Sequence, residues 1–190
     1  MRCFVAVDVA PEVRAAIVRA QARLRAAAPH ADVRWTPSAG FHVTLKFLGA
    51  VAEERVPDVV AAVGRAIAGA ESLALAAGGL GAFPSRAHAR IVWAGIAVGG
   101  ESVAALATAI DAAVAPLGFP AEARPFHAHV TIGRVRSPRA VRDLAAALEG
   151  RATDSFGAWT AAEVVFYESR LRPTGAEYVR VADWRLGNDA

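Results

Sequence analysis

The sequence predicts an α+β fold of two lobes, each a mainly antiparallel sheet with outer helices, related by an approximate twofold axis around a central cleft. Segments with helical spacing alternate with strand-like runs joined by short turns, which favours antiparallel pairing. One pattern also occurs twice, as His42-Val43-Thr44-Leu45 and His129-Val130-Thr131-Ile132. No long polar or proline-rich linker interrupts the chain. We therefore expect residues 1–190 to form a single bilobal domain, with approximate lobes 1–98 and 99–190 and strands that can be exchanged between them.

The chain is expected to begin with a strand and a helix. Cys3–Val9 is an apolar run of strand length, and apolar residues at helical spacing follow Pro11 until the next proline. Two further runs, 33–36 and 41–48, flank Pro37-Ser38-Ala39-Gly40, which is a turn sequence. They are therefore expected to form an antiparallel pair.

A second helix and two strands are expected to complete the first lobe. Apolar residues recur at helical spacing from Val56 to Ile67, and strand-like runs follow at 73–75 and 89–98. The glycines of 78–84 lack the spacing and the succeeding helix of a nucleotide-binding loop. A dinucleotide-binding fold is therefore not predicted.

The second half of the chain is expected to repeat the arrangement. A helix over 103–114 precedes the second His-Val-Thr strand, and a helix over 141–148 follows it. Two closing strands, Ala162–Leu171 and Tyr178–Leu186, are expected to be joined by the turn Arg172-Pro173-Thr174-Gly175.

Composition narrows the class of protein. With 190 residues, 55% of them hydrophobic, the chain is long enough for a substantial core. Its net charge of +3 permits an anionic ligand but does not indicate a protein that coats nucleic acid. The single cysteine, Cys3, excludes an internal disulfide and is expected to be a packed thiol. No signal-peptide pattern or apolar stretch of membrane-spanning length is expected, so a cytoplasmic location without membrane contact is predicted.

The repeated motif indicates acid–base chemistry. In a β-strand, His and Thr at positions i and i+2 share one face, whereas Val and Leu or Ile turn into the core. Each copy therefore presents one imidazole and one hydroxyl. Two such strands side by side would surround a small anion with two titratable rings and two hydrogen-bond donors, which suits cleavage of a phosphoester. His30 and His88 lack this setting and are expected to be exposed.

The two motifs and their surroundings resemble the two-histidine (2H) phosphoesterases, specifically the RNA 2′,3′-cyclic phosphodiesterase branch, also called 2′-5′ RNA ligase-like. The resemblance covers nearly the whole chain. Its departures are mild: His127-Ala128 stands where a proline commonly precedes the second histidine, and Ile132 replaces the usual Leu. Besides the motifs, the matching segments are Arg2–Val7, Val33–Thr36, Phe41–Gly49, Gly81–Pro84, Arg124–Phe126, Gly133-Arg134 and Phe166–Ser169, with Gly175, Tyr178 and Trp184.

The resemblance implies a bilobal enzyme that needs no metal or other cofactor and opens a terminal 2′,3′-cyclic phosphate to a 2′-phosphomonoester. Its partners would be RNA ends or small nucleotide 2′,3′-cyclic phosphates, without an obligate protein partner. His129 is assigned as proton acceptor and His42 as proton donor, although an approximate twofold axis leaves the direction open. Thr44 and Thr131 would hold the non-bridging oxygens. Reverse 2′-5′ ligation would use the same step.

Further side chains are candidates for the site. Arg134 would add a cation, but strict alternation places it off the face of His129, so the strand must end or twist by Gly133. Lys46 shares the ideal face of His42, or is a solvated strand end. Phe4 and Trp35 are either core residues or platforms on which a base stacks.

Two other classes of function remain as alternatives. A metal hydrolase could use His127 and His129 as a chelating pair with His42 as a third ligand, but this leaves the repeated threonines without a role. A non-catalytic module could bind RNA ends or a nucleotide in the same cleft. Substrate length, base preference and oligomeric state are open.

Overall fold

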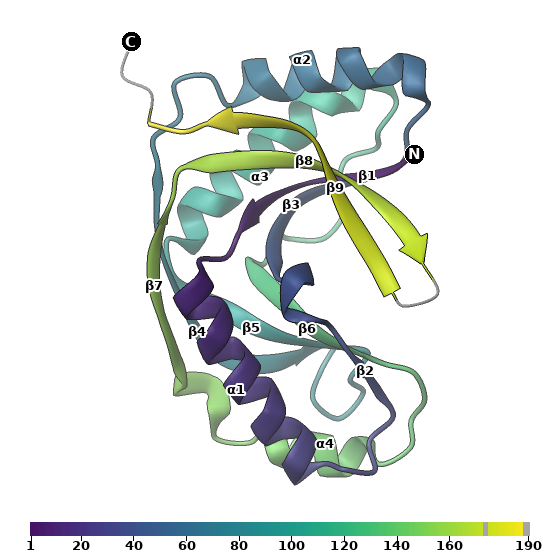
Figure 1. Ribbon diagram of the computed structural model, residues 1–190, viewed down its shortest axis with the longest axis vertical. Helices are drawn as coiled ribbons and strands as arrows, with labels where there is room; N and C mark the ends of the chain where they lie inside the picture. The colour runs from purple at the N-terminus through teal and green to yellow at the C-terminus, as the bar shows by residue number, and fades with distance from the viewer. Residues whose placement is uncertain (173–174, 188–190) are drawn as a thin grey trace.

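The computed structural model describes residues 1–172 and 175–187 (Figure 1). Its strands form one curled, antiparallel sheet, and helices cover the outside, which confirms the predicted fold class. The strands are β1 Arg2–Asp8, β2 Val33–Trp35, β3 His42–Ala50, β4 Leu73–Phe83, β5 Ile91–Val98, β6 His129–Val135, β7 Ser155–Ala161, β8 Glu163–Arg172 and β9 Gly175–Arg185. The α-helices are α1 Pro11–Ala27, α2 Val56–Ala66, α3 Gly100–Val114 and α4 Val141–Leu148.

The sheet has two halves that meet at the motif strands. Its order is β7-β4-β5-β6-β3-β1-β8-β9, with β2 added beside β6. One half, β3-β1-β8-β9, joins the first strand of the chain to the last, and the other is β7-β4-β5-β6. Each half therefore combines strands from both predicted lobes. Between the halves, β3 and β6 pair at Val43 and Val130.

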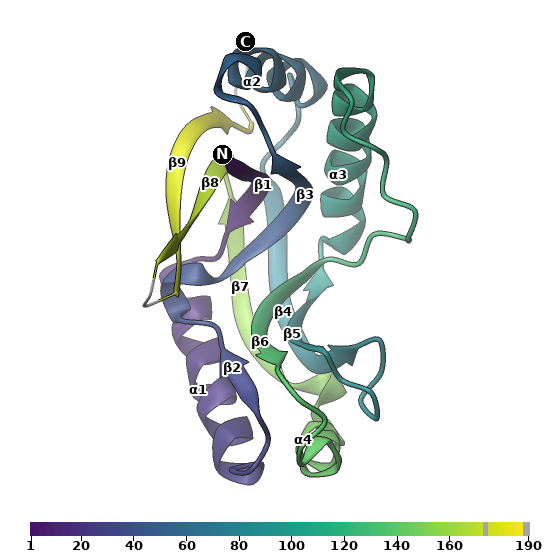
Figure 2. The ribbon, with the colours of Figure 1, turned by 90° about the vertical axis from the view of Figure 1, so that its right-hand side faces the viewer.

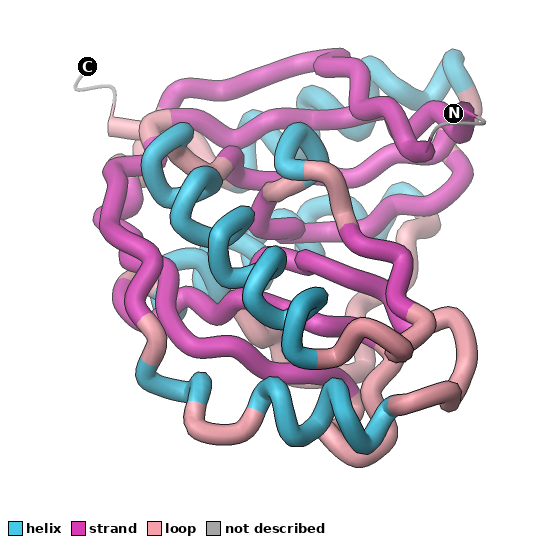
Figure 3. Tube along the Cα trace, turned by 60° about the horizontal axis from the view of Figure 1, so that its bottom comes forward, coloured by secondary structure: helices cyan, strands magenta, loops and turns pink. Residues whose placement is uncertain are grey.

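The helices are shared between the two halves of the sheet. In Figures 1 and 2, α2 and α3 lie together beside the half that contains β1 and β3, whereas α1 and α4 lie at the other end. Contacts of α3 with β3, and of α1 with β7, agree with this arrangement. The tube in Figure 3 shows α1 crossing the strands on the side toward the viewer. The outer faces of the sheet are thus covered, and the motif strands meet between the helix pairs.

The core follows the alternation of the strands. Val5 and Val7 of β1 point into the main core, whereas Phe4 and Ala6 point the other way and pack with Val165 and Tyr167 of β8. Cys3 is buried, as expected of a packed thiol. The second face of β1 is therefore also covered, but by aromatic residues that continue toward His42.

The expected pairing of the second and third strands is wrong. Residues 38–40 form a 3-10 turn, and β2 pairs with β6 instead of β3. The physical reason is a buried amide: Nε2 of Gln21 in α1 donates to the carbonyls of Thr36 and Ile132, both at 2.8 Å. This side chain links the end of β2 to β6.

Two strands differ from prediction in extent. β4 continues to Phe83, well beyond the expected 73–75, and β7 is absent from the strands that the sequence predicts. β4 is rich in Ala and Gly and changes register near Gly78, so its sequence lacks the β-branched residues that mark a strand. The predicted turn 172–175 includes residues 173–174, which lie outside the described residues.

One helical segment corrects the expectation about apolar stretches. Gly100–Leu117, which contains α3, is long and apolar enough to cross a membrane by length and composition, with a mean hydropathy of 1.3. Its residues Val103, Ile110 and Val114 are buried in the core, and α3 contacts β3 and α2. The expectation that no such stretch exists is therefore wrong, although the inner face of this one is part of the core.

Candidate active site

The structure brings the two His-Val-Thr motifs side by side on adjacent antiparallel strands. Val43 and Val130 face each other and are fully buried, so the flanking His and Thr side chains project from the opposite face, where all four are partly exposed. In an antiparallel ladder, the residue before one partner lies beside the residue after the other. The register therefore brings His42 alongside Thr131 and Thr44 alongside His129.

Both imidazoles are held in the same way. Nδ1 of His129 lies 2.7 Å from the carbonyl oxygen of His127, and His42 makes a hydrogen bond to the backbone of Gly40, also two residues earlier. A ring that donates Nδ1–H to a carbonyl keeps Nε2 as its free nitrogen. Nε2 of His129 is therefore available for proton transfer, and the single backbone hydrogen bond of His42 leaves one of its ring nitrogens available as well.

The surroundings favour the neutral form of both rings. The pKa of His42 is lowered to about 4, mainly by burial and also by the charges of His129, Arg14 and Arg134, against an opposing hydrogen bond to Gly40. Burial also lowers the pKa of His129, with additional contributions from His127 and Arg134. Near neutral pH the free site therefore holds two neutral imidazoles beside fixed positive charge, which is an attractive environment for an anion.

A register shift follows each motif and changes which residues face the site. Along β3, Val5 pairs with Lys46 and Ala6 with Thr44, so Leu45 is an extra residue. Along β6, Ile132 is the extra residue between the positions paired with Trp93 and Val92. Such a bulge turns the residues beyond it to the other face. The two strands thus share a bulge as well as a motif.

On β6 this bulge turns Arg134 toward the histidines. Ile132 and Gly133 are both buried, whereas Arg134 is exposed, and its charge acts on both His42 and His129. Gly133 permits the arrangement because a Cβ there would lie 2.8 Å from Cγ1 of Val33 in β2. The twist that the sequence required at Gly133 is thus supplied by the bulge.

On β3 the equivalent bulge removes Lys46 from the site. Lys46 is only 2% exposed, forms an ion pair with Asp111 of α3, and donates to the carbonyl oxygen of Pro120 at 2.7 Å. Both expectations for Lys46, a place on the His42 face or a solvated strand end, are wrong. Phe47 takes the position equivalent to Arg134 and is 59% exposed.

Aromatic rings surround each histidine. Phe4 stacks on His42 with ring centroids 4.7 Å apart, and Tyr178 meets the same ring edge-on at 5.2 Å. On the other side, Phe83 meets His129 edge-on at 5.1 Å. Trp93 lies beside Phe83 and extends this wall. These contacts fix the rings and account for the burial that lowers their pKa values.

Three candidates from the sequence take supporting positions. Phe4 is buried beneath His42 and is therefore a core residue at the base of the site, as the core interpretation held. Trp35 pairs with Gly133 and packs against the main core. His127 is exposed and lies 5.0 Å from the Trp93 ring, while His30 and His88 are exposed, as expected.

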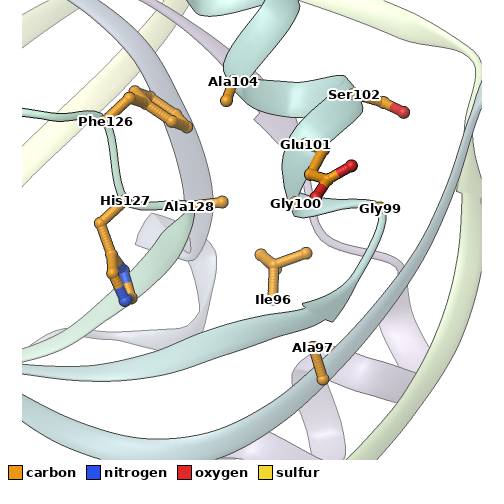
Figure 4. Close-up of a pocket in the computed structure, with 10 residues that line it drawn as sticks. All are labelled: Ile96, Ala97, Gly99, Gly100, Glu101, Ser102, Ala104, Phe126, His127 and Ala128. Carbon is orange, nitrogen blue, oxygen red and sulfur yellow. The ribbon is translucent and has the colours of Figure 1, made fainter.

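One pocket lies beside the motifs and not on them. It has a volume of about 670 Å³ and lies between the start of α3 and the segment that leads into β6 (Figure 4). Figure 4 shows His127 at its edge, but neither motif histidine lines it. The second pocket, about 280 Å³, includes His42 together with Asp8, Arg14 and Arg180. We regard the smaller pocket as part of the site because His42 lines it.

The geometry gives little support to the metal-hydrolase alternative. The rings of His127 and His129 are 6.2 Å apart, and each contacts Phe83. In residues 1–172 and 175–187, no three His, Cys, Asp or Glu side chains form a group that could hold a metal ion.

Sequence reasoning missed several residues around His42. Asp8, Arg14 and Tyr167 come from β1, α1 and β8 and meet beside the histidine. Asp8 and Arg14 carry no local motif, and Tyr167, although part of a segment that matches the family, comes beside Asp8 only through the pairing of β1 with β8. Arg14 alone offered a signal, as an arginine in the first turn of the helix that follows a buried strand.

Comparisons with known proteins agree with the geometry. The family model described as LigT like phosphoesterase matches residues 7–93 and 97–178. An RNA 2′,3′-cyclic phosphodiesterase of Methanothermobacter thermautotrophicus is 32% identical over 98% of this chain and 99% of its own length. A crystal structure from Thermus thermophilus superposes with a TM-score of 0.81 at 29% identity and covers all of both chains. LigT of E. coli, in its complex with NADP+, matches with a TM-score of 0.73 at 25% identity over 98% of each chain. The chain therefore belongs to the family of LigT-like phosphoesterases, the 2H phosphoesterases.

Proposed function

We propose that this chain hydrolyses the 2′,3′-cyclic phosphate at an RNA end to a 2′-phosphomonoester by paired histidine acid–base catalysis. The observation that carries the proposal is the placement of His42 and His129 on adjacent strands, with each ring held by a hydrogen bond to the backbone two residues earlier. Curated relatives named RNA 2′,3′-cyclic phosphodiesterase support the substrate class. The nucleotide complex of E. coli LigT supports a nucleotide ligand.

The proposed step moves one proton at each histidine. Nε2 of His129 accepts a proton from water as the water oxygen bonds to phosphorus. The bond from phosphorus to the ribose 3′ oxygen breaks, and that oxygen takes a proton from His42. The product retains the phosphate on the 2′ oxygen. Exchange with solvent then restores the starting protonation of both rings.

The lowered pKa of His42 sets a condition on this step. A donor must be protonated, whereas His42 in the free site is neutral near pH 7. A phosphate anion beside the ring raises its pKa because opposite charges attract. When the substrate binds, His42 would thus take from solvent the proton that the leaving group needs. Thr44 and Thr131 would donate to the non-bridging oxygens, and Arg134 would offset their charge.

The test is incubation of the purified protein with an oligoribonucleotide that ends in a 2′,3′-cyclic phosphate, with and without EDTA, followed by assignment of the product isomer by ³¹P NMR. We expect a 2′-phosphate in both samples. The same assay is run on His42→Ala. Its matched control is His30→Ala, because His30 is an exposed histidine. Ligation is assayed by adding an RNA with a free 5′-hydroxyl, which would replace water in the same step.

Two other outcomes would contradict the proposal. Activity that EDTA abolishes and zinc restores would favour the metal alternative with His127 and His129. Binding of the RNA end without turnover would instead assign the chain to the non-catalytic binding class.

A further inference from the structure

Among the described residues, one cation of the smaller pocket, Arg14, forms no ion pair with an acidic side chain. The pocket has a volume of about 280 Å³ and lies beside His42 at the start of α1. Three charged side chains line it: Asp8, Arg14 and Arg180. Their hydrogen bonds decide which of these charges is available to a ligand.

Asp8 and Arg180 are already engaged. The hydroxyl of Tyr167 donates to both carboxylate oxygens of Asp8 at 2.9 Å. Arg180 donates to Glu163 at 3.1 and 2.7 Å and lies 3.6 Å from Asp183 and 4.0 Å from Asp8. These groups form a network on one side of the pocket in which the three carboxylates of Asp8, Glu163 and Asp183 surround Arg180, so the charge of Arg180 is taken up within the network.

Arg14 is held differently. Its Nη1 donates to the carbonyl oxygen of Ser38 at 2.7 Å, and its Nη2 donates to that of Val9 at 3.1 Å. In the part of the chain that the structure describes, no carboxylate lies within 4.0 Å of it. Two carbonyls therefore fix the guanidinium without neutralising it. Its remaining N–H donors suit a phosphate oxygen, which guanidinium binds with defined geometry.

The position of Arg14 agrees with the direction of the substrate in the proposed function. His42 protonates the ribose oxygen that leaves, so the terminal ribose lies on the His42 side of phosphorus. The 5′ carbon of that ribose leads to the next phosphate of the RNA chain. Arg14 lines the pocket on this same side of the site.

We propose that Arg14 binds the phosphodiester that joins the terminal nucleotide to its 5′ neighbour. The preferred substrate is then an RNA end of two or more nucleotides and not a nucleoside 2′,3′-cyclic phosphate. This inference rests on the proposed function, and it adds a second phosphate subsite to the one formed by the histidines, the threonines and Arg134.

The test compares two substrates with the same terminal nucleoside: the nucleoside 2′,3′-cyclic phosphate and the dinucleotide that ends in it. We expect the wild type to prefer the dinucleotide in kcat/KM. Arg14→Gln should lower kcat/KM for the dinucleotide about tenfold, mainly through KM, and change the nucleoside value less than about threefold. Arg14→Lys, which keeps the charge, should retain part of the preference. Arg19→Gln, an exposed arginine of the same helix, is the matched control.

A change in the substrate provides an independent check. A dinucleotide with an uncharged methylphosphonate linkage should be cleaved by the wild type as poorly as the normal dinucleotide is cleaved by Arg14→Gln. The slope of log kcat/KM against log salt should fall by about 0.7 when either charge is removed, as for the loss of one phosphate contact to a single strand.

Each result bears on the inference separately from the proposed function. Equal losses on both substrates, or no loss in Arg14→Gln, would overturn the subsite while hydrolysis itself stands. If the wild type cleaves neither substrate, the proposed function fails. Calorimetry then compares the affinity for the dinucleotide 2′-phosphate with that for the nucleoside 2′-phosphate. This comparison decides whether Arg14 binds the second phosphate. A dinucleotide preference that Arg14→Gln leaves unchanged would overturn the subsite in that assay too.

Discussion

His42 and His129 differ in the charges that act on them, although their backbones are equivalent. Arg14 and Arg134 both lower the pKa of His42, whereas only Arg134 of these two acts on His129. A substitution at Arg14 therefore alters one ring, and a substitution at Arg134 alters both. This difference can identify the donor and the acceptor, which an approximate twofold axis makes indistinguishable in the sequence.

The first prediction concerns the pH profile of kcat/KM with a nucleoside 2′,3′-cyclic phosphate. Because both pKa values are lowered, the maximum should lie below pH 6.5, the ordinary pKa of imidazole. Arg14→Gln removes a positive charge and should raise the pKa of His42 alone. If His42 is the donor, the fall in activity at high pH should shift to higher pH, and the low-pH limb of the profile should stay in place. Arg134→Gln should shift both limbs of the profile to higher pH.

Proton NMR titration of the histidine rings checks the direction of each shift independently of turnover. Movement of the low-pH limb in Arg14→Gln would assign His42 as the acceptor and reverse the roles. Unchanged limbs in both variants would mean that neither arginine sets the ionisation of the rings.

The threonines give a second prediction at the residue scale. Thr44→Val and Thr131→Val keep the branched shape that suits a strand but remove the hydroxyl donor. If the hydroxyls stabilise charge that develops on the phosphoryl oxygens, turnover should fall about 100-fold in either variant while KM changes less. Thr160→Val, at an exposed position of β7, is the control. Arg134→Ala should instead mainly raise KM and weaken its salt dependence.

Steady-state kinetics at two ionic strengths separate these cases. Unchanged turnover in both threonine variants would show that the repeated threonine serves only to shape the strand. A loss of turnover without a rise of KM in Arg134→Ala would place that charge in the transition state.

At the scale of elements, the bulge after each motif decides what reaches the site. The sequence places Arg134 off the face of His129 and Lys46 on the face of His42, and the extra residues Leu45 and Ile132 reverse both positions. One half of the site then ends in an aromatic ring, Phe47, and the other in a guanidinium. The two motif strands are alike in backbone and unlike in chemistry, so the site is asymmetric for an asymmetric substrate.

The prediction at this scale tests the position of Lys46. Lys46→Met leaves Asp111 without its partner at a largely buried place, so the protein should lose about 2 to 4 kcal/mol of unfolding free energy, measured by urea denaturation. Turnover of the folded protein should stay within about twofold, because Lys46 faces α3 and not the phosphate. The double variant Lys46→Met, Asp111→Leu should recover part of the loss.

An exposed pair provides the control for this variant. Arg55→Met removes the partner of Asp58 at the surface and should cost less than about 1 kcal/mol. A Lys46→Met protein of normal stability and low turnover would contradict the bulge and return Lys46 to the site.

The sequence predicted the helices and strands more fully than it predicted the pairing of the strands. Residue periodicity predicted the four helices and the motif strands, because these segments carry clear apolar spacing. It missed β7, and it missed most of β4, where Ala and Gly replace β-branched residues. The bulges and the β2–β6 pairing depend on contacts between distant segments, such as Gln21 with Ile132, and no local pattern encodes them. Asp8 and Arg14 escaped notice for the same reason.

At the scale of the whole molecule, the site exists only where the two halves of the sheet meet. His42 belongs to the half with β1, β8 and β9, and His129 to the half with β4, β5 and β7. The pairing of β3 with β6 joins Val43 to Val130, one residue away from each histidine. The distance between the two rings therefore depends on how the entire sheet curls, and neither half alone contains an acid and a base.

This dependence gives the last prediction. Because proton acceptance and donation occur in one step, loss of either ring should remove most of the acid–base contribution. His42→Ala and His129→Ala should each lower turnover about 100-fold or more, and the double variant should cost much less than the product of the two losses. Single-turnover kinetics of the three variants, with matched unfolding curves, measure the coupling. A double variant whose loss equals that product would mean that the rings act independently. Near-normal turnover in either single variant would remove that histidine from the reaction.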